Sequence, residues 1–337
     1  MGDENSKSFS NEDVINAIEE NKKLISKLNR KVRLLDTKTR NQDRILESYK
    51  NLFTYLYVHH DIKPKGTLKD MQDLCLELLR FMDNVCKKYN IDYWLDFGTL
   101  LGSVRHEGFI PWDDDVDVGI LKKDFDKFLK VFKKEVEDNG LDEFITILEK
   151  KKYDNSVTGF VQILYFKSPL VNNMLAGIDL LPYEYLKDDE NLPIEELKAK
   201  ISNKIIEMRD EFIEKEYFKK YPEEAHRKFN ENLNVVDHEA EYIIASAVNL
   251  NPRIIKLYKT KDFFPLQKVK FEQYYFPSVN HDKDYLKAVF GDDYMELPKI
   301  VSFHTRMQTV MKKDVDDLHE LYRGEILRLR KINEKWM

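Results

Sequence analysis

Residues 93–119, YWLDFGTLLGSVRHEGFIPWDDDVDVG, carry the signal that decides the fold. This stretch holds four of the 11 glycines, and three consecutive aspartates lead into an apolar run. The alternation in Asp115-Val116-Asp117-Val118 predicts a strand with both carboxylates on one face and both valines on the other. Because two acids on one face repel each other, the pattern indicates a cation between them, and hard oxygen ligands suit Mg²⁺ or Mn²⁺. We therefore expect a metal-dependent site that acts on phosphate groups.

A glycine-containing turn precedes this acidic strand. Gly98 and Thr99 follow directly on an expected strand, and Gly102 lets the backbone come close to a ligand. The amides and hydroxyls of this turn, that of Ser103 included, are candidate phosphate-binding groups. An ordinary strand-to-helix turn has the same composition. The position before the acidic strand favours the binding interpretation.

Four polar residues around the two motifs have more than one interpretation. Arg105 and His106 either contact phosphate or act as an acid or base, or they are ordinary surface or structural residues. Asp113 and Asp114 either support the metal ligands or cap the turn. Asp179 stands alone in an apolar strand-like run, where an unpaired carboxylate is costly to bury, so we expect it to face a cation.

The segments on either side predict an α/β body. Helical spacing of apolar residues predicts an amphipathic helix over 67–90, and Asp124 is expected to cap a later helix. Short apolar or alternating runs predict strands at 92–97, 116–121, 144–148, 160–166 and 177–181. After Pro193 the pattern is mainly helical to about residue 247. An irregular aromatic segment follows at 263–304, and a last amphipathic helix covers 314–336.

The N-terminal part has a different pattern. Residues 11–62 contain no glycine or proline, and their apolar residues repeat at heptad spacing. One seam position, a, holds Ile18, Ile25, Val32, Thr39, Leu46 and Phe53, and the other, d, holds Val14, Asn21, Leu28, Leu35, Gln42, Tyr49 and Leu56. Lysines at g and aspartates at e (Lys31, Lys38, Asp36, Asp43) favour a parallel pair. We expect residues 1–64 to form a coiled-coil oligomerisation segment; a single helix folded back on the body is the alternative.

Composition narrows the class of protein. The chain has 337 residues, a net charge of −6 and 42% hydrophobic residues, which excludes disordered and collagen-like proteins. Its 55 basic and 61 acidic residues give no reason to expect nucleic-acid binding. No run approaches the roughly 20 apolar residues of a membrane-spanning helix, and the first residues lack a signal peptide's apolar core. We expect a cytoplasmic chain, free or at the inner face of the membrane, with Cys75 and Cys86 reduced.

The acidic motif and later segments resemble one family. The run GTLLGSVRHEGFIPWDDDVDVGI (98–120) resembles the signature of the LicD family, the phosphocholine transferases related to fukutin. IDLLPYEYL (178–186) is similar to that family's next acidic strand. Two further segments (263–277 and 284–298), followed by His304, resemble its C-terminal pattern. The likeness covers about 65–305 and implies that residues 65–337 are a nucleotidyltransferase-type catalytic domain, with a mixed-sheet core and helical additions.

The resemblance also implies an activity. Family members transfer a phosphorylated alcohol, typically phosphocholine from CDP-choline, to a hydroxyl of a cell-surface glycan or polyol-phosphate acceptor such as a teichoic acid, and release CMP. The resemblance matches Asp115 and Asp117 to paired Mg²⁺ ligands and Asp179 to a third acid, either a base or another ligand. Gly98 and Thr99 match the phosphate-facing turn.

Other functions remain open at this point. The fukutin branch uses CDP-ribitol, and CDP-glycerol is a further possible donor. A GT-A glycosyltransferase would use Asp115-Val116-Asp117 to hold a sugar nucleotide, and would release a nucleoside diphosphate. A scaffold that has lost activity would not need the three acids. A calcium-binding loop is disfavoured, because Val118 occupies the glycine position and Asp124 the position of the bidentate glutamate.

Overall fold

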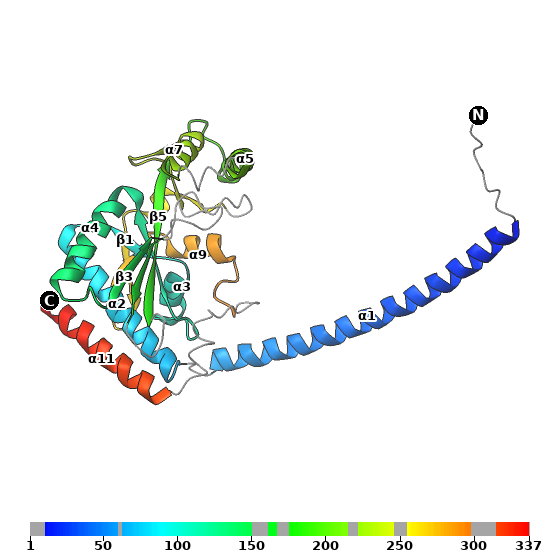
Figure 1. Cartoon of the computed structure of the whole chain (residues 1–337), viewed down its shortest axis with the longest axis horizontal. Coiled ribbons are helices and arrows are strands. Elements are labelled where there is room, and N and C mark those ends of the chain that lie inside the picture. The colour runs from blue at the N-terminus through cyan, green and yellow to red at the C-terminus, as the bar shows by residue number, and fades with distance from the viewer. Residues whose placement is uncertain are drawn as a thin grey trace. The chain divides into compact units, whose positions relative to one another are not determined.

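The computed structural model describes residues 11–59, 63–149, 161–166, 175–214, 222–245, 255–297 and 315–336. The chain divides into two units, Met1–Ile62 and Lys63–Met337 (Figure 1). Of the described helices, none combines the length and the apolar content needed to cross a membrane.

The first unit is one continuous helix, α1 (Asn11–His59), of 49 residues. The expected heptad seam lies along it, and most of its apolar side chains are exposed, from 47% for Val14 to 65% for Leu46. An apolar stripe of this length on a lone helix is unusual, because most helices bury such a face against another element. The long helix is confirmed, and its pairing into a coiled coil stays a prediction.

The second unit is built on a mixed sheet. Five of its strands follow the spatial order β1-β2-β5-β4-β3: β1 (Tyr93–Leu95), β2 (Val116–Leu121), β5 (Ala176–Leu186), β4 (Val161–Tyr165) and β3 (Ile145–Glu149). Strands β2 and β5 run parallel, and the other pairs in this order are antiparallel. Strands β6 (Val235–Val236) and β7 (Tyr242–Ala245) pair with the second half of β5, and β8 (Leu257–Lys259) pairs with β7. The expected α/β class with a mixed-sheet core is confirmed.

Helices cover this sheet. The predicted amphipathic helix is α2 (Thr67–Tyr89), whose apolar stripe is buried in the main core. The last helix, α11 (Val315–Asn333), packs along α2, as Figure 1 shows. The short α3 (Phe97–His106) connects β1 to β2, and α4 (Lys122–Asp138) follows β2. The remaining elements are α5 (Ile194–Glu214), α7 (Pro222–Leu233), α8 (Thr260–Phe263), β9 (Gln267–Phe271), β10 (Tyr274–Ser278), α9 (Asp282–Phe290) and the 3₁₀ turn η1 (Glu334–Trp336).

Three expectations about local structure were wrong. Asp124 does not cap α4, which begins at Lys122, so Asp124 lies in the first turn, where a negative charge favours the helix. The stretch expected to be mainly helical to about 247 contains the helices α5 and α7 but ends in strands β6 and β7, because the second half of β5 offers these strands a pairing partner. The aromatic segment is regular, since β9 and β10 form an antiparallel hairpin that α9 follows.

Strand β5 runs five residues past its predicted end at Leu181. The next residue, Pro182, lacks the N–H that a central strand needs. In the structure β4 pairs with Ala176–Leu180 and β7 pairs with Tyr183–Leu186. Pro182 lies between these two partners, so its missing N–H removes no bond to either of them. The strand therefore continues through the proline.

A second, smaller core lies against this far half of the sheet. It collects Leu186, Leu197, Ile201, Ile205, Met208, Leu233, Tyr242, Ile244 and Leu257. Strand β7 separates the two cores, since Ile243 and Ala245 belong to the main core and Tyr242 and Ile244 to the smaller one. Both faces of β7 are therefore buried, which explains why its sequence is apolar throughout.

Gly119 is required by the packing of the tryptophan beside it. Gly119 and Trp94 are register partners in β2 and β1. A Cβ at Gly119 would lie 2.2 Å from Trp94 Nε1. The indole is fully buried and packs edge-on against Tyr183 and Phe263, with ring centroids 5.1 and 5.4 Å away. The packed indole therefore cannot shift to make room for a Cβ at Gly119.

We therefore expect Gly119→Ala to lower the free energy of unfolding by about 2–3 kcal/mol, the usual range for overpacking a dense core. Gly324→Ala is the matched control, because a Cβ there meets nothing within 4 Å and the position lies inside α11. It should gain about 0.5–1 kcal/mol from helix propensity. Urea unfolding with unchanged m-values measures both. Equal stability of the two variants would contradict this account of Trp94.

Candidate active site

The three predicted acids meet on one face of the sheet. Asp117 of β2 lies in parallel register with Asp179 of β5. Asp115 precedes Asp117 by two residues, which puts it on the same face. Val116 and Val118 between and beyond them are fully buried. The alternation predicted from the sequence is therefore present, and the sheet pairing brings the distant Asp179 to it.

A glutamine from the next strand fixes the third acid. Gln162 of β4 lies opposite Asp179, and its Nε2 donates to Asp179 Oδ1 over 2.7 Å. This hydrogen bond holds Oδ1 of Asp179 in place, while the second oxygen of the carboxylate makes other contacts. The sequence analysis did not single out Gln162, because one polar residue in a short strand is no local signal.

The N-terminal turn of α3 packs against the same acids. Thr99 Oγ1 accepts a hydrogen bond from the Asp117 amide over 2.8 Å. A Cβ at Gly98 would lie 3.1 Å from Asp113 Oδ2 and 3.7 Å from Asp117 Oδ2. A larger residue at position 98 would thus crowd both carboxylates. Gly98 and Thr99 therefore join the acid cluster, as the sequence order suggested.

A fully buried aspartate, Asp96, holds the start of α3. Its Oδ1 accepts from the Phe97 amide over 2.9 Å, which makes it the N-cap of the helix. Tyr183 donates its hydroxyl proton to Oδ2 over 2.7 Å, and Tyr285 donates to Oδ1. Burial raises the pKa of Asp96, and these bonds oppose that rise. Asp96 was not among the predicted site residues, because its tyrosine partners lie far from it in the sequence.

The carboxylates are crowded enough to perturb one another. Burial, and then its acidic neighbours, raise the pKa of Asp117 well above its usual range; these neighbours are Asp115, Asp179, Asp113 and Asp96. Carboxylate oxygens of Asp113, Asp114 and Asp115 lie within 4.8 Å of one another. Asp113 and Asp114, left open by the sequence, thus belong to the same group of acids. A set of hard oxygens with this much negative charge fits a divalent cation such as Mg²⁺.

Arg105 and His106 lie at the other end of α3. At 1.5 Å per residue, they are about 10 Å along the helix axis from Gly98. The Arg105 Nη1 donates to the carbonyl oxygens of Tyr294 and Glu296, at 2.9 and 3.0 Å. Burial and the charge of Arg105 lower the pKa of His106 to about 4, so its imidazole is neutral at pH 7. These contacts tie α3 to the segment after α9, and a direct role at the acids stays a prediction.

Gly102 and Ser103 pack against neighbouring segments of the same chain. A Cβ at Gly102 would lie 2.5 Å from the Gly108 carbonyl oxygen, so this glycine permits close packing of α3 on the loop that follows it. The Ser103 hydroxyl donates to the carbonyl oxygen of Lys270 in β9 over 2.6 Å. Both residues position α3, and their proposed contact with a ligand stays a prediction.

Lys256 is a cation that the sequence analysis did not single out. It directly precedes β8, and its Nζ lies 3.6 Å from the centroid of the Phe97 ring. Burial lowers the pKa of this ammonium, whereas the charges of Asp96 and Asp117 raise it. Lys256 therefore lies at the N-terminus of α3, beside the acids. Its local sequence, Ile-Ile-Lys-Leu-Tyr, carries no motif.

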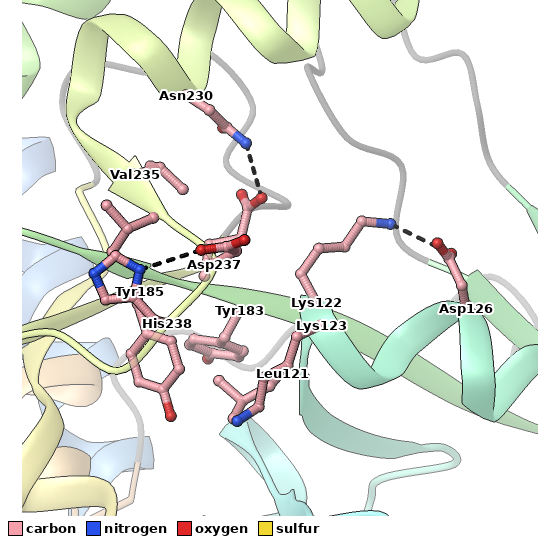
Figure 2. Close-up of a pocket in the computed structure, with 12 residues that line it drawn as sticks. Leu121, Lys122, Lys123, Asp126, Tyr183, Tyr185, Asn230, Val235, Asp237 and His238 are labelled. Atoms are coloured by element: carbon pink, nitrogen blue, oxygen red, sulfur yellow. Dashed lines mark hydrogen bonds and ion pairs between the residues drawn. The ribbon is translucent and has the colours of Figure 1, made fainter.

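A separate pocket of about 570 Å³ opens beyond the acids, at the other end of β2 (Figure 2). Its lining includes Leu121, Lys122, Lys123, Tyr185 and His238, and none of the clustered acids. Leu121 is four residues past Asp117, or about 13 Å along the strand. The charged groups that line the pocket already have partners. Asn230 donates a hydrogen bond to Glu184 at 3.0 Å, and His238 lies 3.1 Å from Asp237. The pocket and the acid cluster are thus distinct.

Several sequence expectations fall outside the described residues. These are Phe160 at the start of a predicted strand, Pro298 in the C-terminal pattern, and His304. In the described part of the aromatic segment, Phe263, Phe271 and Phe276 are buried in the main core.

Comparison with known proteins agrees with this arrangement. Residues 90–185 match the family described as LicD/FKTN/FKRP, nucleotidyltransferase domain, which confirms the resemblance. The chain is 41% identical over 75 residues to the lipopolysaccharide cholinephosphotransferase LicD of Haemophilus influenzae, covering 22% of this chain and 28% of that protein. It is 46% identical over 48 residues to the human ribitol 5-phosphate transferase FKRP, covering 14% and 10%. Against the mouse ribitol-5-phosphate transferase FKTN, identity is 41% over 49 residues, covering 14% and 11%. The matches thus span little more than a quarter of these relatives' lengths at most.

Proposed function

We infer that this chain, whose residues 90–185 are a domain of the LicD/FKTN/FKRP nucleotidyltransferase family, is a metal-dependent transferase of phosphorylated alcohols. It would take the group from a CDP-alcohol and pass it to a hydroxyl of a cell-surface glycan or a polyol phosphate, releasing CMP. The observation that carries the proposal is the register of β2 with β5, which places Asp117 beside Asp179 within the matched domain. Asp115 lies two residues before Asp117. Three carboxylates on one face are suited to phosphoryl transfer.

Each acid has a proposed role. Asp115 and Asp117 would hold Mg²⁺, or Mn²⁺ in its place, with Asp113 and Asp114 close enough to contribute. The bound ion supplies charge that offsets the negative charge on the phosphoryl oxygens. Asp179 would either accept the proton of the acceptor hydroxyl or serve as a further ligand. In both roles the hydrogen bond from Gln162 orients it.

The start of α3 would bind the phosphate. Backbone amides at a helix N-terminus, with the helix dipole behind them, favour an anion. Thr99 accepts its hydrogen bond from the Asp117 amide, so its own hydroxyl proton can be donated to a phosphate oxygen. Gly98 keeps this turn free of a side chain where the carboxylates come closest.

Phosphocholine is our first choice for the transferred group, because the longer match is to a protein named as a cholinephosphotransferase. Ribitol phosphate is the second choice, because three relatives from mouse and human are named for it. The identities cover short segments, and alcohol selectivity depends on the shape of the binding pocket.

The test is a donor screen that identifies the nucleotide released. The full chain is incubated with CDP-choline, CDP-ethanolamine, CDP-ribitol or CDP-glycerol and a glycan or polyol-phosphate acceptor, in MgCl₂ or in EDTA. We expect CMP in MgCl₂ only, fastest from CDP-choline. Release of a nucleoside diphosphate from sugar nucleotides, with no CMP from any CDP-alcohol, would indicate a glycosyltransferase and overturn the proposal. Absence of turnover with every donor would also count against it.

We also propose that the chain self-associates through α1 as a parallel coiled coil. The exposed seam would be buried against a second copy, and Lys31 at g of one chain would face Asp36 at e of the other. In the single chain, Asp36 pairs with Arg40 at 2.6 Å on the exposed helix surface, a contact worth little. The pairing of two such helices would explain why this 49-residue helix carries an exposed apolar stripe.

Two adjacent leucines of α1 allow a matched test of this pairing. Leu35 occupies a d position and Leu34 a position outside the seam, and they are 62% and 64% exposed. We expect Leu35→Asp to convert the oligomer to a monomer and Leu34→Asp to leave its mass unchanged, because only the first places a charge in the seam. Light scattering coupled to size exclusion gives the mass. A monomeric wild type at micromolar concentration would refute the coiled coil.

A further inference from the structure

Lys256 is partly buried, and none of the described acids forms an ion pair with it. Within the described part of the chain, no carboxylate or carbonyl oxygen accepts a hydrogen bond or forms an ion pair with its Nζ. The Nζ of Lys256 lies over the face of the Phe97 ring, 3.6 Å from its centroid. Such a cation–π contact compensates only part of the hydration that a partly buried ammonium loses. The fold therefore keeps a cation beside the acids at a net cost.

The neighbouring acids are engaged elsewhere. Asp96 accepts hydrogen bonds from the Phe97 amide, Tyr183 and Tyr285, so both of its oxygens already have donors. Asp117 lies in the crowd of carboxylates for which we propose a metal ion. Lys256 feels the charge of both acids but forms an ion pair with neither. Its ammonium is thus free to bind an added anion.

The ring beneath the ammonium is held in an unusual backbone conformation. Phe97 is the first residue of α3 and has a φ of +35°, which a residue with a Cβ rarely adopts. Strained residues of this kind concentrate at functional sites, where surrounding contacts hold them in place. Here the Asp96 cap fixes the Phe97 amide, and the ring lies under Nζ. The ammonium is consequently positioned at the N-terminal end of α3, where an anion is already favoured.

We propose that Lys256 is a phosphate-binding residue whose ammonium contacts a nonbridging oxygen of the donor's diphosphate. The inference rests on the proposed function, since the phosphate is that of a cytidine diphosphate. It adds a cation supplied by the chain itself to a site whose other charged side chains repel the ligand. Lys256 enters the site from the segment before β8, so the phosphate would be held between α3 and a segment about 160 residues further along the chain.

The experiment compares ligands that share a base and differ in phosphate. Binding of cytidine and of CDP to the full chain in MgCl₂ is measured by calorimetry for the wild type and for Lys256→Met, which keeps the length of the side chain without its charge. We expect Lys256→Met to weaken CDP binding about 10- to 100-fold, the value of one charged hydrogen bond, with cytidine binding unchanged. Lys256→Arg should recover most of the loss. A merely structural role would weaken both ligands together.

Lys259→Met is the matched control, because Lys259 is exposed at the end of the same strand, three residues on. It should bind CDP like the wild type. If Lys256→Met keeps the full gain of CDP over cytidine, the phosphate role is overturned, while CMP release in the donor screen still supports the proposed function. If the wild type gains no affinity from the phosphates, both proposals are overturned.

Discussion

Asp117→Asn should lower the rate of CMP release on the order of 1,000-fold and, in EDTA, make the protein more stable. The loss of activity follows from removing a proposed metal ligand. The gain in stability follows from removing one of several carboxylates that repel one another around a buried position. A gain of about 1 kcal/mol is expected. Opposite signs for activity and stability are typical of a side chain kept for function rather than for packing.

The pH dependence gives a further readout of this variant. Because the pKa of Asp117 is raised on folding, the folded state binds the proton more tightly, so metal-free wild type loses stability as pH rises from about 4 through the raised pKa. Asp117→Asn should lack this loss. Melting curves in EDTA between pH 4 and 8 measure it. Asp92→Asn, at an exposed position before β1, is the control and should change neither activity nor stability. A folded Asp117→Asn enzyme with full metal-dependent activity would contradict the site.

Glu77→Ala should lower the free energy of unfolding by about 3–5 kcal/mol, the cost of breaking a buried ion pair from one side. Glu77 of α2 is fully buried, and its carboxylate accepts hydrogen bonds from Arg80 at 2.7 Å, Arg330 at 3.1 Å and Asn333 at 3.0 Å. The last two belong to α11, so one carboxylate joins both helices. Its removal leaves the guanidinium of Arg80, which is 8% exposed, without its acid.

Denaturant unfolding monitored by circular dichroism measures this change. The control is Asp138→Ala, which breaks the exposed pair with Lys134 on α4 and should change stability by no more than about 0.5 kcal/mol. The acid cluster is formed by β2 and β5, so folded Glu77→Ala protein should keep its CMP release. A loss of less than about 1 kcal/mol would show that α11 is held by its apolar contacts alone.

The parts of the fold that could be predicted are those with a local pattern. The period of 3.6 residues in α2 and of two in β2 sets their faces, and both elements lie within a residue of the predicted bounds. The closeness of Asp117 and Asp179 could be inferred only from chemistry, because each acid was expected to face a cation. Strands β6 and β7 could not be predicted, because their conformation depends on the exposed edge of β5.

The site residues that could be predicted are likewise those with a local sequence pattern. The acids form a visible motif, whereas Lys256 is one lysine among many and reaches α3 only through the pairing of β8 with β7. Asp96 was overlooked because its partners, Tyr183 and Tyr285, come from distant segments. Gly102 and Ser103 had the composition of a ligand-binding turn, but a close approach of backbone to backbone uses the same residues.

Strand β5 is shared by the two hydrophobic cores of the body. The first half of β5 carries Asp179 and belongs to the main core, while Leu186 at its end belongs to the smaller core under α5 and α7. Loosening the smaller core therefore leaves the spacing of the acids intact but releases the segment that carries Lys256. A ligand held by the acids and by Lys256 would contact segments that pack in different cores, so donor binding should stabilise both cores together.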